Sequence, residues 1–152
     1  MGFNIVLVEP EIPTNTGNIG RLSLASGSAL HLVKPFGFEL DDKHLKRAGL
    51  DYWKHISINI YENIEDFYLK NKDVNMVYFS SSATKNYTTI NFQDNMFFLF
   101  GKESVGLSKK ITVKNSEKLY RIPIYSKHVR SLNLANAVSI VVYEALRNLK
   151  IE

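Results

Sequence analysis

The sequence predicts an α/β protein built on a mostly parallel sheet flanked by helices. Short apolar runs rich in β-branched and aromatic residues alternate along the chain with stretches of helical period, and no linker or repeat interrupts them. Such alternation is typical of parallel βαβ units. Because 152 residues suit one domain, we expect residues 1–152 to form a single domain with five or six strands.

The N-terminal part of the chain begins with a strand. Asn4–Val8 (NIVLV) is a continuous apolar run, which predicts a strand buried on both faces. Two prolines within residues 9–13 predict a loop, because proline cannot donate to a regular ladder. A helix is expected from residue 16 or 17 to Ser26, followed by a second strand over Ala29–Val33.

The alternation continues to the C-terminus. Asp41 and Asp42 are suited to cap a helix that runs through Arg47. Strict period-two alternation over Ile56–Tyr61 predicts a strand at a sheet edge or with one exposed face. The remaining expected elements are a short helix over Ile64–Asn71, a buried strand over Asn75–Ser80 with a polar loop after it, strands over Met96–Phe100 and Leu119–Ile124, and a long helix over Leu132–Leu149.

Composition excludes several classes of chemistry. The chain has no cysteine, so disulfides and thiolate sites are excluded, and its four histidines lack any metal-binding spacing, so we expect no metal. A formal net charge of +4 permits a polyanionic partner without requiring one. No apolar run approaches the roughly 18 residues of a membrane span. We therefore expect no membrane association and a cytoplasmic location.

The first candidate loop reads NTGNIGR, residues 15–21. It lacks the full GxGxxG pattern, which argues against a dinucleotide-binding dehydrogenase. We interpret Asn15 as an amide that stabilises the loop and Arg21 as a cation directed at a phosphate or oxyanion. The alternative is a glycine-rich start of a helix with an ordinary surface arginine.

The second candidate loop reads FGKESVGL, residues 100–107. Its Gly-Lys pair is not a nucleotide-binding P-loop, because Met96 stands where that motif needs glycine and Glu103 where it needs Ser or Thr. Gly101 allows close approach of a ligand to the backbone. Glu103 is a candidate acceptor for a ribose hydroxyl.

The third candidate segment spans residues 122–138 and leads into the last helix. Ser131 is the expected N-cap of this helix, and Asn133 and Asn136 are expected to share one of its faces. Capping and a polar stripe explain these residues as well as a ligand does. The apolar band of the last helix is wide, so it faces either another subunit or the core of its own domain.

Together these segments resemble a known family. In order and spacing, NTGNIGR, FGKESVGL and IPIYSKHVRSLNLANAVSIVVYEALR are similar to the three motifs of the SPOUT superfamily of RNA methyltransferases. With EPEIPTNTGNIGRL and DDKHLKRAGLDYW, the resemblance covers residues 3–149 and points to the single-domain TrmL/YibK branch. It implies a C-terminal deep trefoil knot, a homodimer, and S-adenosyl-L-methionine bound in the knot loops.

The resemblance also implies an activity and its residues. The reaction is methyl transfer to the ribose 2′-hydroxyl of the wobble nucleotide, C34 or U34, in the anticodon loop of tRNA, with tRNA-Leu isoacceptors as substrates. The alternatives are 2′-O-methylation at another tRNA or rRNA site and a non-catalytic RNA-binding dimer. Residue by residue, the motifs assign cofactor binding to Phe79, Gly101, Ile122, Ser131 and Leu132, and catalysis to Arg21, Asn15, Glu103 and Asn133.

Two further features bear on RNA binding. In related enzymes the first-motif arginine acts on the 2′-hydroxyl; because arginine stays protonated, we favour phosphate anchoring and alkoxide stabilisation for Arg21. A basic rim for RNA phosphates is expected from Lys46, Arg47, Lys127 and Arg130. Tyr143 is either an RNA contact or an interface residue, and Tyr52 and Trp53 are more simply explained by burial than by base stacking.

Overall fold

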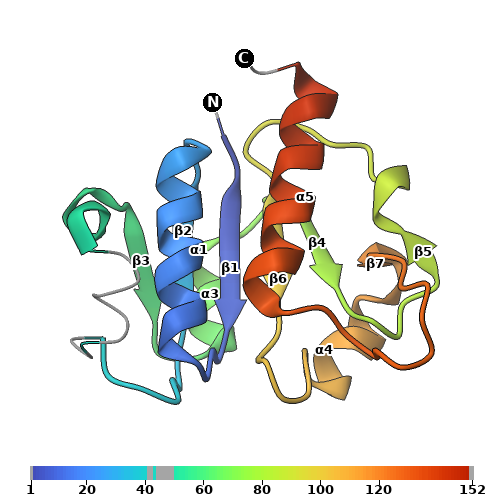
Figure 1. Cartoon of the computed structure of the whole chain (residues 1–152), viewed down its shortest axis with the longest axis horizontal. Helices are drawn as coiled ribbons and strands as arrows, with labels where there is room; N and C mark the ends of the chain where they lie inside the picture. The colour runs from blue at the N-terminus through green and yellow to red at the C-terminus, as the bar shows by residue number, and fades with distance from the viewer. Residues whose placement is uncertain (1, 41–42, 44–49, 151–152) are drawn as a thin grey trace.

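The computed structural model describes residues 2–40, 43 and 50–150. Its sheet has seven strands, all parallel, in the order β3-β2-β1-β6-β4-β7-β5 (Figure 1). The strands are β1 (Asn4–Val8), β2 (Ala29–Val33), β3 (Ile58–Tyr61), β4 (Met76–Phe79), β5 (Lys85–Asn86), β6 (Phe97–Phe100) and β7 (Leu119–Arg121). The predicted α/β class is confirmed, but the predicted five or six strands are too few.

Helices cover both faces of this sheet. They are α1 (Pro13–Ala25), α3 (Ile64–Lys70), α4 (Lys109–Lys114) and α5 (Leu134–Leu149), with 3₁₀ turns η1 (Leu50–His55), η2 (Tyr87–Thr89) and η3 (Ser116–Lys118). In Figure 1, α1 and α5 lie in front of the sheet and α3 lies behind it. Within the described part of the chain, no helix is long and apolar enough to cross a membrane.

The two faces of the sheet carry separate hydrophobic cores. Successive side chains of a strand point to opposite faces. In β1, Ile5 and Leu7 pack in the core that includes Val138 and Val141 of α5, whereas Val6 and Val8 pack in the other core. Because both faces are covered, β6 is apolar and buried at every position and β1 is so from its second residue onward, which explains their apolar runs.

The edges of the sheet differ from its centre. β3 forms one edge, as its period-two pattern predicts, and it begins only at Ile58 because the preceding residues form η1 and a short connection. β5 forms the other edge and has two residues within the predicted polar loop. No apolar run marks β5, which is why the sequence does not predict it.

Several predicted boundaries are wrong for local reasons. α1 begins at Pro13, whose fixed φ and missing N–H suit the first helical turn. Residues 15–21 therefore lie inside a helix and not in a loop. The N-cap of α5 is Asn133 and not Ser131, because the Asn133 side chain accepts the Asn136 N–H at 3.3 Å.

Two further differences lie in the second half of the chain, and one predicted helix is not covered by the described residues. β7 ends at Arg121, two residues before Pro123. α4 was not predicted, although Ser108 caps it by accepting the Ile111 N–H at 3.3 Å. The helix predicted to run through Arg47 lies outside the described residues.

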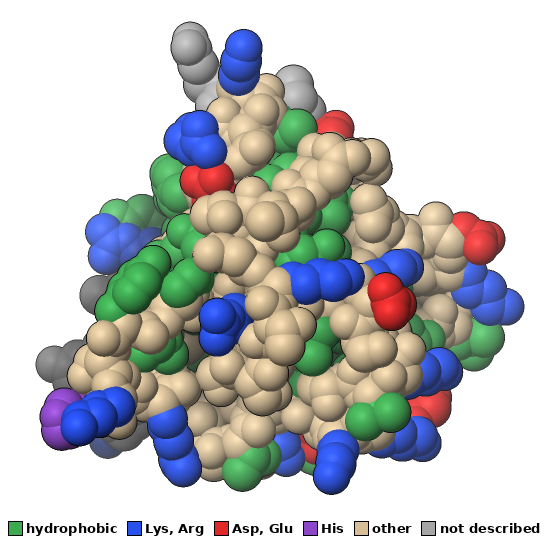
Figure 2. Space-filling model, turned by 90° about the vertical axis from the view of Figure 1, so that its right-hand side faces the viewer, with side chains coloured by type: hydrophobic (Ala, Val, Ile, Leu, Met, Phe, Trp, Pro, Cys, Tyr) green, Lys and Arg blue, Asp and Glu red, His purple; other side chains and the backbone are tan. Residues whose placement is uncertain are grey.

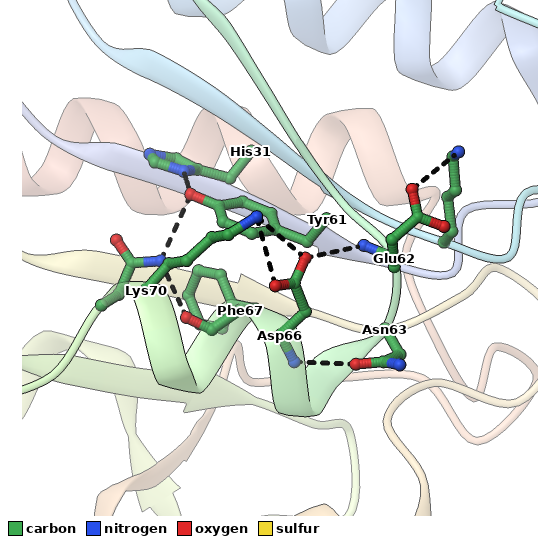
Figure 3. A network of polar contacts seen from close by, with 9 residues as sticks. His31, Tyr61, Glu62, Asn63, Asp66, Phe67 and Lys70 are labelled. Atoms are coloured by element: carbon green, nitrogen blue, oxygen red, sulfur yellow. Dashed lines mark hydrogen bonds and ion pairs between the residues drawn. The ribbon is translucent and has the colours of Figure 1, made fainter.

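A polar network is buried on the α3 side of the sheet (Figure 3). The His31 ring is 5% exposed, and its Nε2 lies 2.9 Å from Asn4 Oδ1 while its Nδ1 lies 2.8 Å from the Tyr61 hydroxyl. Because Asn4 Oδ1 only accepts, neutral His31 donates from Nε2, and Tyr61 donates to Nδ1. Asn71 Nδ2 then donates to the Tyr61 oxygen at 3.2 Å. With a neutral His31 ring, each of these three hydrogen bonds therefore has one donor and one acceptor.

This network predicts a specific loss of stability in acid. Burial lowers the pKa of His31 from 6.5 to about 4. The unfolded chain therefore binds a proton between pH 6.5 and 4 that the folded chain does not, and this group's contribution to stability falls by about 2–3 kcal/mol as the pH drops through that window. In urea unfolding at pH 7 and pH 4.5, His31→Gln should lose correspondingly less stability than the wild type. Equal losses would contradict the assignment.

Candidate functional site

A pocket of about 580 Å³ opens at the carboxyl ends of β4, β6 and β7. In parallel α/β sheets, ligands bind at this edge, and the volume falls in the range of about 300–1,000 Å³ found for small-molecule sites. The walls come from three chain segments, residues 79–81, 100–106 and 122–134, with Ile12 and Asn15 of the α1 end and Ala137 of α5. The pocket is therefore assembled from segments far apart in the sequence.

Gly101 allows two of the pocket's backbone segments to touch. A Cβ at this position would lie 2.0 Å from the Leu107 nitrogen and 2.1 Å from the Gly106 carbonyl carbon, so no side chain fits. The loop closes on itself because the Gly106 N–H donates to the Lys102 carbonyl at 2.8 Å. Gly106 has φ +73°, a conformation that glycine adopts without strain.

Aromatic rings form the apolar wall of the pocket. Phe79 at the end of β4 stacks on Phe100 at the end of β6, with ring centroids 4.7 Å apart and an interplanar angle of 10°. Both rings are buried, and Ile122 and Leu132 add partly exposed apolar surface from the third segment. All five residues predicted to bind the cofactor (Phe79, Gly101, Ile122, Ser131 and Leu132) thus line one pocket.

Glu103 ties the second segment to the start of α1. Its carboxylate accepts the Glu11 N–H at 3.1 and 3.2 Å and also accepts the Ile12 N–H. α1 has no acidic residue in its own first turn, so Glu103 supplies the negative charge that a helix N-terminus favours. Glu103 lines the pocket, but both of its oxygens are engaged with backbone.

The same junction is held from the opposite direction. The Ser104 N–H donates to Glu11 Oε1 at 2.8 Å, and this interaction with Ser104 holds the pKa of Glu11 below its usual value. Lys102 Nζ lies 3.6 Å from Glu9 Oε1. Glu11 is not among the residues predicted from the sequence. The two acids that flank Pro10 are visible there, but nothing in one sequence shows that Glu11 faces residue 104.

Asn15 and Asn133 join the two helices of the front layer beside the pocket. Asn133 Nδ2 donates to Asn15 Oδ1 at 3.1 Å across 118 residues of sequence. Both side chains line the pocket, and Asn15 is only 7% exposed. The structure therefore brings together three of the four predicted catalytic residues, Asn15, Glu103 and Asn133.

Arg21, the fourth, lies elsewhere. It sits two turns further along α1 on an exposed face and does not line the pocket of its own chain. Its guanidinium lies 4.9 Å from the centroid of the Tyr52 ring. Tyr52 is 39% exposed, so its expected burial is wrong.

Lys46 and Arg47 of the predicted basic rim lie outside the described residues. Among the described residues, no cluster of three His, Cys, Asp or Glu is arranged to hold a metal ion.

A parallel sheet with an apolar pocket at its carboxyl edge defines an α/β protein that binds a small organic ligand. The chain matches the SpoU rRNA Methylase family over residues 2–143, and it belongs to that family. This confirms the resemblance that the three motifs indicate.

Individual relatives support this membership. The tRNA (cytidine(34)-2'-O)-methyltransferase of Methylovorus glucosotrophus is 43% identical over 95% of this chain and 94% of its own length. A solved structure described as "Structural insights into the 2-OH methylation of C/U34 on tRNA" has a TM-score of 0.94 at 37% identity, over 99% of this chain and 97% of that one. The AdoMet-bound rRNA methyltransferase of Sinorhizobium meliloti has a TM-score of 0.86 at 28% identity, over 97% of this chain and 57% of that one.

The contact at Gly101 predicts that even a methyl group disrupts the site. Gly101→Ala should lower the free energy of unfolding by about 3 kcal/mol, because backbone must move to admit the Cβ. Gly106→Ala is the matched control: its Cβ meets nothing within 4 Å, so only the positive φ opposes it, at about 1 kcal/mol. Urea unfolding of both variants measures the difference. Similar losses in the free energy of unfolding for the two variants would show that the loop backbone moves at little cost, which would contradict this prediction.

The carboxylate of Glu103 should contribute through its charge. Glu103→Gln keeps the shape of the side chain but weakens its bonds to two backbone N–H groups, so we expect a loss of about 1–2 kcal/mol in the free energy of unfolding. Glu117→Gln, at an exposed position on η3, should change it by less than about 0.5 kcal/mol. Urea unfolding at low and high salt tests this. Because salt screens the charge of the carboxylate, the loss of stability in Glu103→Gln should be smaller at high salt but still measurable. No loss at either salt concentration would refute the role.

Proposed function

We propose that this protein transfers a methyl group from S-adenosyl-L-methionine to the ribose 2′-hydroxyl of C34 or U34 of tRNA, with tRNA-Leu isoacceptors as substrates. The observation that carries the proposal is the single pocket that collects all five expected cofactor residues from three separate segments. Family membership and the names of full-length relatives support the same reaction. Its site of action is the cytoplasm, where it meets tRNA.

The pocket fits the proposed cofactor. Phe79, Ile122 and Leu132 offer apolar surface for a flat adenine ring, and the bare backbone at Gly101 lets a ligand approach main-chain donors and acceptors. Ser131 adds a hydroxyl at the rim. S-adenosyl-L-methionine supplies a methyl group already activated by a sulfonium centre, so the chain's own residues chiefly have to align the hydroxyl and assist loss of its proton.

The four predicted catalytic residues divide into two groups. Asn15, Glu103 and Asn133 hold the walls of the pocket through the hydrogen bonds described above, and we assign them to positioning the reacting ribose. Arg21 is the group that anchors phosphate and stabilises the developing alkoxide. Arg21 does not line the pocket of its own chain, so we assign it to the pocket of a second copy.

This division supports the expected homodimer. α1 and α5 lie side by side on the front of the sheet (Figure 1). They expose Leu24, Ile140 and Tyr143, which are 36%, 37% and 52% exposed. A pairing through these helices covers that surface and carries Arg21 toward the partner. We also propose that the path of residues 80–134 forms the deep trefoil knot, since it leads from β4 around the pocket and returns α5 to the front layer.

The proposed function predicts where the label appears. Full-length protein, labelled S-adenosyl-L-methionine and total tRNA from cells lacking the gene should give one labelled nucleoside, 2′-O-methylated cytidine or uridine at position 34 of tRNA-Leu. Nucleoside mapping by mass spectrometry identifies it. Label on a base, at another position, or on rRNA alone would contradict the proposal, and no label with tight RNA binding would favour a non-catalytic dimer.

The same assay tests Arg21. Arg21→Ala should reduce methyl transfer by about 100-fold or more, the loss typical of removing one preorganised charge-stabilising group. Cofactor affinity, measured by calorimetry, should stay within twofold of the wild type because the proposed role of Arg21 is toward the phosphate and the ribose hydroxyl of the RNA, and the proposed cofactor contacts come from other residues. Lys72→Ala, an exposed cation beyond α3, is the control and should remain active. An active Arg21→Ala would remove this residue from the mechanism.

A further inference from the structure

The segment between β7 and α5 links the pocket to an exposed rim. Ile122 and Ile124 line the pocket at one end of this segment, and residues 130–134 line it at the other. Residues 125–129 between them are all exposed and belong to no helix or strand. This stretch is therefore the exposed connection between two parts of the pocket wall.

Tyr125 stands out in that stretch. It is 96% exposed, more than any other large hydrophobic side chain of the described residues. Single exposed apolar side chains are ordinary, but here Val129 follows at 48%, Leu132 at 37%, and Val105 of the facing pocket loop at 76%. Leu132 and Val105 line the pocket themselves, so exposed apolar groups gather around one opening.

The chain segment that contains Tyr125 carries charge of one sign. Residues 118–143 contain no Asp or Glu, and within them Lys118, Arg121, Lys127 and Arg130 are all exposed. Figure 2 views the side of the molecule that carries β5, β7 and this segment; Lys and Arg side chains are spread across that face, with Asp and Glu side chains among them. An exposed aromatic ring in a segment that carries cations and no acids suits single-stranded nucleic acid, which offers stacking faces and phosphates together.

We propose that Tyr125 stacks on a nucleobase of the anticodon loop beside the nucleotide whose ribose enters the pocket, while Lys127 and Arg130 contact the flanking phosphates. This rests on the proposed function and adds a substrate-binding residue to it. Reaching a 2′-hydroxyl in a single-stranded loop requires that the target nucleotide leave its stack, and a ring at the pocket mouth replaces the lost neighbour. A protein partner would require acids to match these cations, and a second copy of this chain offers none in the same segment.

The first test measures RNA binding by variants of the full chain. For a labelled anticodon stem-loop at fixed salt, Tyr125→Ala should weaken binding by at least about fivefold, the lower end of what one base stacked on one aromatic ring contributes. Tyr125→Phe and Tyr125→Trp should bind within twofold of the wild type, since both retain a stacking face. Leu69→Ala, an exposed apolar side chain on α3, is the control and should leave binding unchanged.

The second test locates the stacked base. Stem-loops that lack the base at position 33, 34 or 35 are compared with the intact RNA for the wild type and Tyr125→Ala. With the base missing at position 33 or 35 the penalty of Tyr125→Ala should disappear, because the partner of the ring is already gone, whereas loss of the base at position 34 should leave the penalty in place. An unchanged penalty with all three RNAs would overturn the stacking assignment.

Other outcomes distinguish a failure of the Tyr125 proposal from a failure of the proposed methyltransferase function. Unaltered RNA binding by Tyr125→Ala would overturn the role of Tyr125 while leaving methylation by the wild type intact. An equal loss of S-adenosyl-L-methionine affinity, or a change of oligomeric state in light scattering, would show that Tyr125 serves the cofactor or the subunit interface instead. If the wild type itself does not methylate the stem-loop, the proposed function fails and this inference fails with it.

Discussion

The backbone of Gly101 lies against that of Gly106 and Leu107, and no side chain fits between them. This contact turns the end of the most buried strand, β6, into a tight loop whose backbone faces the pocket. Glu103 and Glu11 then hold that loop against the start of α1 through bonds made in both directions. Every other wall of the pocket is positioned relative to this junction, because β6 pairs directly with both β1 and β4.

The junction explains why one short chain can build a site from three distant segments. Parallel strands end at the same edge of a sheet, so the loops after β4, β6 and β7 meet there without any further device. Asn133 adds the last connection by capping α5 and donating to Asn15 of α1. The side chain of Asn133 therefore both caps a helix and fixes a wall of the pocket, so one residue serves the fold and the site together.

The α3 side of the sheet and the pocket mouth differ in how their side chains are exposed to water. On the α3 side, His31, Tyr61 and Asn71 form a closed network in which each polar group has a partner, so that side is a sealed core. Around the pocket mouth, apolar and basic side chains remain open to water. Arg21 lies away from the pocket of its own chain, in contrast to Asn15, Glu103 and Asn133.

Local patterns in the sequence determined the fold class, the central strands and the residues around the pocket. Buried parallel strands need continuous apolar runs, and the close backbone contact after β6 needs glycine at position 101, so the sequence shows both. The motifs likewise carried the family. The two-residue strand β5 and the start of α1 at Pro13 were not determined in this way, because a neighbouring strand or a proline in a first turn decided them.

Tertiary structure alone decided what the polar residues do. Glu103 has a suitable chemistry for a ribose hydroxyl, yet it accepts backbone N–H groups of a segment 91 and 92 residues away. Arg21 and Asn15 are six positions apart, yet only Asn15 faces the pocket of its own chain. A side chain's partner depends on which distant backbone approaches it, and that approach is set by packing of the sheet and its helices, which no local pattern records.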